Sequence, residues 1–321
     1  MDILEEKQNN ISNLKKSIQN FARELGFEKV GFALPSPLKK DFEYYNQWLS
    51  LGYNASMDYL ERNLDKRKNV ELILPEVKSV IVFAHSYYTG IEHKNNFLKI
   101  SRYAWGKDYH KVIAKKLECV VEFLSSKYKN FKAKIYVDTG PILEKYWAVI
   151  SGIGWQGKNS LVLNKELGSY FFIGILLTNI EFEPDPKVED HCGKCTRCID
   201  ACPTGAIVQP KVIDSRKCIS FWTIEKKREE IISESVDLNG WIFGCDICQE
   251  VCPWNKKAKI TKETDFYPDE IGTNLTEEII LNLTEENFRN IFKNSAIKRA
   301  KYQGLLKNYF HILRKKCTQI D

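Results

Sequence analysis

The chain has 321 residues, enough for two or three domains with a substantial buried core. Its 43% hydrophobic and 28% charged residues are ordinary for a soluble globular protein. The net charge of +6 is mildly basic and is not by itself a signature of nucleic-acid binding.

The sequence lacks the signals of export and of membrane insertion. Residues 1–10 are polar and acidic and have no apolar core of the kind found in a secretory signal. The most apolar stretch, residues 170–177, is far shorter than the roughly 20 residues that a helix needs to cross a bilayer. We therefore expect a cytoplasmic protein without membrane contact. In that reducing compartment, ten cysteines are expected to bind metal and not to form disulfides.

The N-terminal part of the chain alternates helical and strand patterns. Apolar residues at helical spacing between Leu14 and Leu25 predict a helix that ends at Gly26. A further helix is predicted at 110–128, and strands are predicted at 29–33, 79–85, 132–137 and 170–177. This alternation predicts an α/β domain over residues 1–185.

The composition changes after this domain. Residues 181–186 have the character of a linker, and residues 186–256 hold eight cysteines with little regular periodicity. Such a segment is typical of a small domain organised around metal. Helical patterns resume afterwards, so residues 257–321 are expected to form a third, helical and basic region.

Eight cysteines follow the spacing of a ferredoxin with two clusters. The first run reads C-x2-C-x2-C-x3-C-P, a pattern in which the fourth cysteine ligates the other cluster. Its members are Cys192, Cys195, Cys198 and Cys202. The second run lacks one cysteine of this pattern, which Cys218 supplies from upstream. Its other members are Cys245, Cys248 and Cys252.

Counting ligands then gives two complete sets of four thiolates. One 4Fe-4S cluster takes Cys192, Cys195, Cys198 and Cys252. The other takes Cys202, Cys218, Cys245 and Cys248. The alternative is two structural zinc sites, but zinc motifs rarely use an overlapping four-cysteine run followed by proline. We predict a redox enzyme whose clusters pass single electrons to a centre or substrate held by the α/β domain.

Six motifs occur in a characteristic order along the chain. They are ISRYAWGKDYH at 100–110, VDTGPILE at 137–144, GIGWQGKNS at 152–160, the first cysteine run, CISFWTIE at 218–225 and GCDICQEVCP at 244–253. Together they resemble the epoxyqueuosine reductases, over about residues 10–310. The resemblance implies reduction of epoxyqueuosine to queuosine at the wobble position of tRNA, the last step of queuosine biosynthesis. It also implies a cobalamin, in cob(II) and cob(I) states, that receives electrons from the clusters.

The implied fold is related to that of the reductive dehalogenases. In this fold the corrinoid lies between the α/β domain and a ferredoxin-like domain with two 4Fe-4S clusters. Longer family members add helical HEAT-like repeats after the clusters. For residues 257–321 we therefore expect a short α-helical, HEAT-like region.

Asp138 corresponds to the family's catalytic acid. Converting an epoxide to an alkene removes oxygen as water and consumes two electrons and two protons, so the site needs a general acid. Asp138 follows a predicted strand and opens the turn Asp138-Thr-Gly-Pro141. The alternative is that it only hydrogen-bonds the amides of this turn. We also expect desolvation beside the corrinoid to keep Asp138 protonated near neutral pH.

The resemblance implies further contacts with the corrinoid and with tRNA. The implied corrinoid contacts are Arg67, Ser101, Asp138, Lys158, Ser160 and Ser220. For Arg67 and Lys158 the alternative is an ordinary surface charge. Residues 291–320 contain no Asp or Glu, and the predicted phosphate contacts in this run are Lys293, Lys298, Arg299, Lys301 and Lys307. The alternative for this run is a solvated helix face.

The expected partners are a tRNA carrying epoxyqueuosine in its anticodon and an external low-potential electron donor. We expect the chain to act as a monomer. Two other functions remain open: a corrinoid and iron–sulfur reductase of a small molecule, similar to the dehalogenases, and a non-enzymatic electron-transfer subunit. The basic C-terminal run and the missing export signal favour the tRNA enzyme over the small-molecule reductase. Retention of a corrinoid on purification would count against the electron-transfer subunit.

Overall fold

The computed structural model describes residues 3–94, 97–226 and 230–317, so the outer ends of the first and third predicted domains lie outside it. A four-stranded sheet forms the centre of the N-terminal part, in the order β1-β2-β7-β4. The strands are β1 (Lys29–Ala33), β2 (Ser79–Ser86), β7 (Phe171–Thr178) and β4 (Ala133–Tyr136). All four lie within two residues of their predicted ranges. Every neighbouring pair is antiparallel, a feature that the alternation of helices and strands did not reveal.

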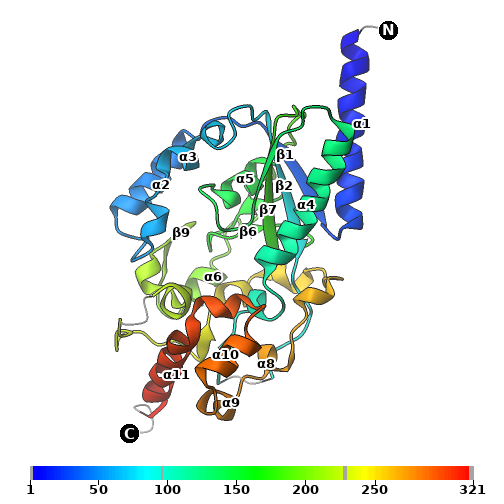
Figure 1. The fold of residues 1–321 in the computed structure, drawn as a ribbon. Coiled ribbons are helices and arrows are strands. Elements are labelled where there is room, and N and C mark those ends of the chain that lie inside the picture. Colours follow the sequence, from blue (N-terminus) through cyan, green and yellow to red (C-terminus); the bar gives the residue numbers. More distant parts are fainter. Residues whose placement is uncertain (1–2, 95–96, 227–229, 318–321) are drawn as a thin grey trace.

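Helices cover both faces of this sheet. Figure 1 shows α1 (Ile3–Glu24) and α4 (Tyr109–Lys127) on one face and α5 (Glu144–Ile150) on the other. Because side chains alternate along β2, Ile81 and Phe83 pack toward α1 and α4, whereas Val80 and Val82 pack toward α5. The peripheral helices α2 (Lys40–Ser50) and α3 (Leu64–Lys68) lie on the α5 side. Both predicted helices of this part, at 14–25 and 110–128, are confirmed.

The cysteine-bearing part consists of short elements. After the hairpin of β5 (Trp155–Gln156) and β6 (Val162–Leu163), it contains α6 (Arg197–Asp200), β8 (Ile207–Gln209), β9 (Val212–Ile213), β10 (Trp241–Phe243) and α7 (Ile247–Glu250). β10 pairs in parallel with β3 (Lys99–Ile100), which belongs to the α/β part of the sequence. The segment with the second cysteine run is therefore joined to the first part by backbone hydrogen bonds.

The C-terminal region is helical, as predicted. Its helices are α8 (Glu270–Thr273), α9 (Glu277–Leu281), α10 (Glu285–Ile291) and α11 (Lys301–Cys317). Thr276 and Thr284 cap α9 and α10 through their side chains, which accept hydrogen bonds from backbone amides in the first turn. α11 buries Leu305 and Tyr309 in a core that also contains Trp241 of β10. The three predicted domains thus share hydrophobic cores, and their boundaries stay a prediction.

None of the helices in the described ranges is both long and apolar enough to span a membrane.

Two glycines of the central sheet allow a matched test of the packing. A Cβ at Gly31 in β1 would lie 2.1 Å from the backbone oxygen of Ser151, just after α5. A Cβ at Gly174 in β7 would meet only side-chain atoms of Leu117 and Ile113, at 3.0 and 3.1 Å. We expect Gly31→Ala to lower the free energy of unfolding by about 3 kcal/mol or more, because backbone must move, and Gly174→Ala by about 1 kcal/mol. Urea unfolding of both variants measures the difference. Equal losses would contradict this account of the sheet.

Candidate functional site

The first group of thiols lies where α6 and α7 meet. Burial raises the pKa of Cys252, and the neighbouring thiols of Cys192 and Cys195 raise it further. Burial likewise raises the pKa of Cys198, with further contributions from Cys252 and Cys192. These are the four cysteines assigned to one cluster from the sequence. Cys195 is exposed, whereas the other seven of the eight are partly or fully buried. Lys158 Nζ donates to the backbone oxygen of Cys195 at 2.9 Å and to that of Gly193 at 2.8 Å.

The second group of thiols has no exposed member. Burial is the main cause of the raised pKa of Cys248, and the charge of Cys218 is the next largest. Cys202 and Cys198 also raise this pKa. Cys245 is in turn a neighbour of Cys248 and Cys218. The group therefore contains the four cysteines assigned to the other cluster. Because Cys198 belongs to the first group, the two groups adjoin each other, as single-electron transfer between clusters requires.

A buried carboxylate fixes the second group to the α/β part. Asp246 follows Cys245 and is fully buried. It accepts hydrogen bonds from the Ser101 hydroxyl and, at 2.7 Å, from the backbone N–H of Arg102. Gly244 has a φ of +70°, and a Cβ there would lie 2.4 Å from the Cβ of Ser101. A glycine is thus required for the loop to approach this turn so closely.

Asp138 lies at the end of β4 in the left-handed region, with a φ of +61°. Its N–H donates to Glu144 Oε1 at 2.6 Å. Its Oδ2 accepts hydrogen bonds from the Tyr109 hydroxyl at 2.8 Å and from His110 Nε2 at 3.3 Å. The carboxylate is thus held by side chains of α4 and not by the amides of its own turn. The Asp138 side chain is 58% exposed, so it can meet a substrate.

The charge of Asp138 differs from our expectation. Desolvation acts to raise its pKa, but the hydrogen bonds from His110 and Tyr109 outweigh this effect and hold the pKa of Asp138 below its ordinary value. The prediction that Asp138 stays protonated near neutral pH is therefore not met by these surroundings. Burial and the nearby Asp138 charge instead raise the pKa of Glu144 to about 8.

Charged side chains connect Asp138 with the second thiol group and with the C-terminal region. Lys145 lies within electrostatic reach of Asp138, Cys248 and Cys218. Arg299, which precedes α11, makes a bidentate ion pair with Glu225 at 2.8 and 2.6 Å and is also an electrostatic neighbour of Asp138. The turn after β4, the second thiol group and the start of the C-terminal basic run therefore border one site.

The implied corrinoid contacts other than Asp138 have varied surroundings. Arg67 is buried and donates to the backbone oxygens of Tyr59 and Arg62, so it is not a surface charge. Ser160 is partly buried with a φ of +63°, and Ser220 hydrogen-bonds the Cys218 thiol. The hydroxyl of Ser101 and the ammonium of Lys158 have the protein partners described above. The role of all five in binding a corrinoid stays a prediction.

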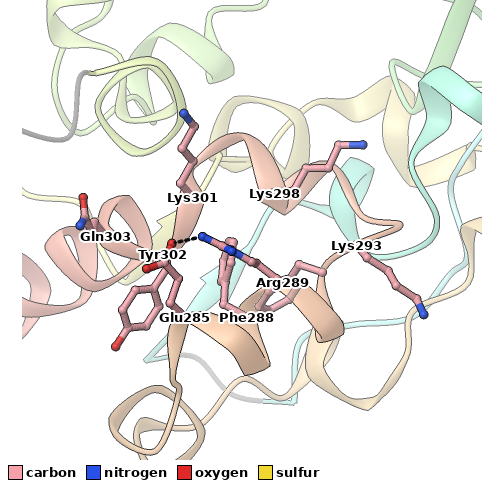
Figure 2. Close-up of a pocket in the computed structure, with 9 residues that line it drawn as sticks. Glu285, Phe288, Arg289, Lys293, Lys298, Lys301, Tyr302 and Gln303 are labelled. Atoms are coloured by element: carbon pink, nitrogen blue, oxygen red, sulfur yellow. Dashed lines mark hydrogen bonds and ion pairs between the residues drawn. The ribbon is translucent and has the colours of Figure 1, made fainter.

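The predicted phosphate contacts fall into two kinds. Lys298 bonds to Asp108, Arg299 to Glu225, and Lys307 lies 3.4 Å from the backbone oxygen of Lys226, so these three have partners within the protein. Lys293 and Lys301 are exposed. Together with Lys298, Arg289 and aromatic side chains they line a pocket of about 350 Å³. Figure 2 shows the three lysines extending away from Phe288 at its centre.

The sequence reasoning missed several residues of this site. His110, Glu144 and Glu225 are the final residues of three motifs that carried the family resemblance, and Tyr109 precedes one of them. Their places at the ends of these motifs could have marked them as candidate site residues. No sequence signal marked Lys145, because a lysine one residue beyond a motif looks like any charged residue on a helix surface.

Comparisons with known proteins agree with this arrangement. Residues 191–255 match the family model of the 4Fe-4S double cluster binding domain, and residues 67–139 match that of epoxyqueuosine reductase QueG, DUF1730. With its α/β part, the chain is therefore an iron–sulfur oxidoreductase that carries two 4Fe-4S clusters. The zinc alternative is thereby set aside.

Similar proteins identify the family. The epoxyqueuosine reductase of Atelocyanobacterium thalassa is 43% identical over 303 residues, which cover 92% of this chain and 98% of that protein. The one from Cellulophaga algicola is 42% identical, covering 88% and 93%. The chain belongs to the epoxyqueuosine reductase family and is an oxidoreductase of queuosine biosynthesis.

Solved structures of this family share the fold. A crystal structure of an epoxyqueuosine reductase with an epoxyqueuosine-modified tyrosine tRNA stem loop has a TM-score of 0.88 and 31% identity, covering 94% of this chain and 81% of that one. The Bacillus subtilis enzyme, solved with the loop of its catalytic aspartate swung out of the active site, has a TM-score of 0.88, 30% identity and coverage of 94% and 82%.

The grouping of the thiols predicts which of the two clusters each cysteine ligates. The anaerobically reconstituted protein should contain about eight irons and no stoichiometric zinc. Cys252→Ser should reduce the iron content toward about four, because it removes a ligand from the cluster of Cys192, Cys195 and Cys198. Cys119→Ser, on α4 outside both groups, is the control and should keep all iron. Iron analysis and electron paramagnetic resonance of the reduced protein test this. A wild-type protein that saturates at about four irons would contradict the assignment.

Proposed function

We propose that this chain reduces epoxyqueuosine to queuosine at the wobble position of tRNA, with a corrinoid bound between Asp138 and the second thiol group. The observation that carries this proposal is the position of Lys145, which lies within reach of Asp138 on one side and of Cys218 and Cys248 on the other. A proton donor and an electron donor thus border the same space. Reduction of an epoxide to an alkene needs both.

The residues around this space suit a corrinoid. The edge of a corrin ring carries amide groups, which need hydrogen-bonding partners when they are enclosed. Ser160, Ser220 and Lys158 supply hydroxyl and ammonium groups from the side of the thiol loops, and Asp138 supplies a carboxylate from the opposite side. Arg67 and Ser101 would support the walls through their protein partners. When bound, the corrinoid in its cob(I) state supplies the nucleophile and the electrons for opening the epoxide.

The two thiol groups would deliver the electrons in sequence. Cys195 is exposed, so the cluster of the first group is accessible to an external low-potential donor. Cys198 of the first group is a neighbour of Cys248 in the second, which gives a short path inward. The second group in turn adjoins the proposed corrinoid space. These positions give the proposed path of the electrons. They pass from the external donor to the first cluster, then to the second cluster and then to the corrinoid.

The basic C-terminal run would hold the RNA at the edge of this site. Arg299 is an electrostatic neighbour of Asp138, and Lys293, Lys298 and Lys301 of the same run line a pocket. A wobble nucleotide lies in a single-stranded loop, so turning its base toward Asp138 costs less than extrusion from a duplex. The crystal structure of a relative with a modified tRNA stem loop supports the choice of tRNA as the partner.

We retain the remaining expectations as parts of this proposal. The chain is divided into a cobalamin-binding α/β domain at 1–185, a ferredoxin-like domain at 186–256 and a short HEAT-like region at 257–321. Its fold is related to that of the reductive dehalogenases, and it acts as a monomer.

Replacing the proposed acid tests the chemistry. Asp138→Asn keeps a residue that tolerates the left-handed backbone but cannot deliver a proton. We expect both clusters and the corrinoid to remain bound and turnover to fall by about 10²–10⁴-fold. Asp41→Asn, an exposed carboxylate on α2, is the control. The measurement is reduction of an epoxyqueuosine stem loop by protein whose cofactors are confirmed by visible spectra. Turnover near that of the wild type would exclude Asp138 from the mechanism.

The exposed lysines of the pocket test the RNA contact. We expect the double variant Lys293→Ala and Lys301→Ala to bind an anticodon stem loop more weakly and to lower the salt dependence of log K by about two units, because two phosphate contacts are lost. The control is the double variant Lys129→Ala and Lys134→Ala, exposed residues that lie just after α4 and in β4. Binding titrations at several salt concentrations give both quantities. If both variants keep the wild-type slope, the RNA binds elsewhere.

A further inference from the structure

Four charged side chains form a continuous chain that ends at Asp138. Lys298 Nζ donates to Asp108 Oδ2. Asp108 Oδ1 lies 2.7 Å from His110 Nδ1, and His110 Nε2 lies 3.3 Å from Asp138 Oδ2. Lys298 is 45% exposed, Asp108 3%, His110 30% and Asp138 58%, so the chain passes from one surface through the buried Asp108 to the site. An imidazole with a buried carboxylate behind it and an exposed carboxylate in front of it is well placed to move protons.

The reaction needs such a device. Removing the epoxide oxygen as water takes two protons, one when the carbon–oxygen bond of the ring opens and one when the hydroxyl leaves. The two electrons come from the external donor through the clusters. A single carboxyl group gives up one proton at a time and must then be reprotonated. Asp138 lies on the substrate side, and His110 lies directly behind it as a proton source.

We propose that His110 supplies both protons to the substrate through Asp138, and that Asp108 orients His110 for this transfer. In each step the proton on His110 Nε2 passes to Asp138 Oδ2, and the carboxyl group passes a proton to the departing oxygen. The imidazole then takes up a proton from water, for which its partial exposure suffices. Lys298 holds Asp108 in place. This inference rests on the proposed function, and His110 acts in it as a positioning and relay residue.

The charges around His110 favour its protonated form. Partial burial alone would lower its pKa, but the hydrogen bonds to Asp108 and Asp138 raise the pKa of His110 to about 9. Tyr109 stacks on the imidazole with ring centroids 4.1 Å apart. Of the other charged groups nearby, Lys298 pairs with Asp108, and Arg299 and Lys145 are electrostatic neighbours of Asp138. Glu144 accepts the backbone N–H of Asp138 and also interacts with His110. The imidazolium is therefore the resident acid at neutral pH, and it is lost as the pH rises through about 9.

A purely structural role for Asp108 is the competing explanation. Its Oδ1 also accepts the backbone N–H of His110 at 3.2 Å and so caps the N-terminus of α4. Asn caps helices as well as Asp does, whereas it carries no charge. Asp108→Asn therefore keeps the cap and weakens the electrostatic support of His110 together with the ion pair to Lys298. This variant separates the two roles.

The first experiment does not depend on turnover. Nuclear magnetic resonance titration of histidine-labelled protein with its clusters in place, with His110→Gln to identify the signal, gives the pKa of His110. We expect Asp108→Asn and Asp138→Asn each to lower it by about 1–2 units, because each removes an adjacent negative charge. Lys111→Gln, an exposed neighbour on α4, should leave it unchanged. An unshifted His110 in both carboxylate variants would contradict the relay.

The second experiment follows the reaction. With cofactors loaded, His110→Gln should slow stem-loop reduction at pH 7 by about 100-fold, and added imidazole should partly restore the rate in His110→Ala. In the wild type the rate should fall above about pH 9, and in Asp108→Asn this fall should move to lower pH with the titration of His110. A pH profile that stays unchanged in Asp108→Asn would reduce Asp108 to a helix cap and overturn the proposal. A loaded wild-type protein that does not reduce the stem loop would contradict the proposed function instead, while the titration still decides the relay geometry.

Discussion

The buried side chain of Asp246 joins the second cysteine run to the α/β part of this protein. It lies between Cys245 and α7, is closed off from water and binds the hydroxyl of Ser101 and the N–H of Arg102 across the junction. Burial raises the pKa of Asp246, and the two hydrogen bonds offset part of the cost of burying this polar group. The second cysteine run is therefore held in one position relative to the α/β part, with the close approach at Gly244 adding to the fit.

This position brings three distant segments to one site. β10 pairs with β3, so the second thiol group lies beside the segment that leads into α4. α4 begins with the hydrogen bonds from Tyr109 and His110 that hold the strained Asp138. The C-terminal region packs its own core against β10, which places Arg299 at the edge of the same site. The turn of Asp138, the second thiol group and Arg299 are thus parts of one packing arrangement.

The basic C-terminal run has a double use. A run of lysines and arginines without acidic residues is most simply interpreted as a surface for phosphates. Two of its members, Lys298 and Arg299, instead form ion pairs with Asp108 and Glu225. Partly enclosed pairs of this kind are screened less by salt than exposed ones and can fix a helix to its neighbours. Lys293 and Lys301 line the same pocket as Lys298, so an anionic partner bound there would lie close to the residue that holds Asp108.

The sequence by itself determined the presence of a segment for two 4Fe-4S clusters, the strands and helices of the α/β part and the family. Cysteine spacing is a local property, because C-x2-C brings thiols together whatever the rest of the fold does, and apolar periodicity is read within a dozen residues. The tertiary structure decided the antiparallel direction of the sheet, the lowered pKa of Asp138 and its partners His110, Glu144 and Arg299. Strand direction depends on how long connections cross the sheet, and a pKa depends on charges contributed by segments up to about 160 residues away in the chain. Local patterns carry neither kind of information, so only the folded chain could supply it.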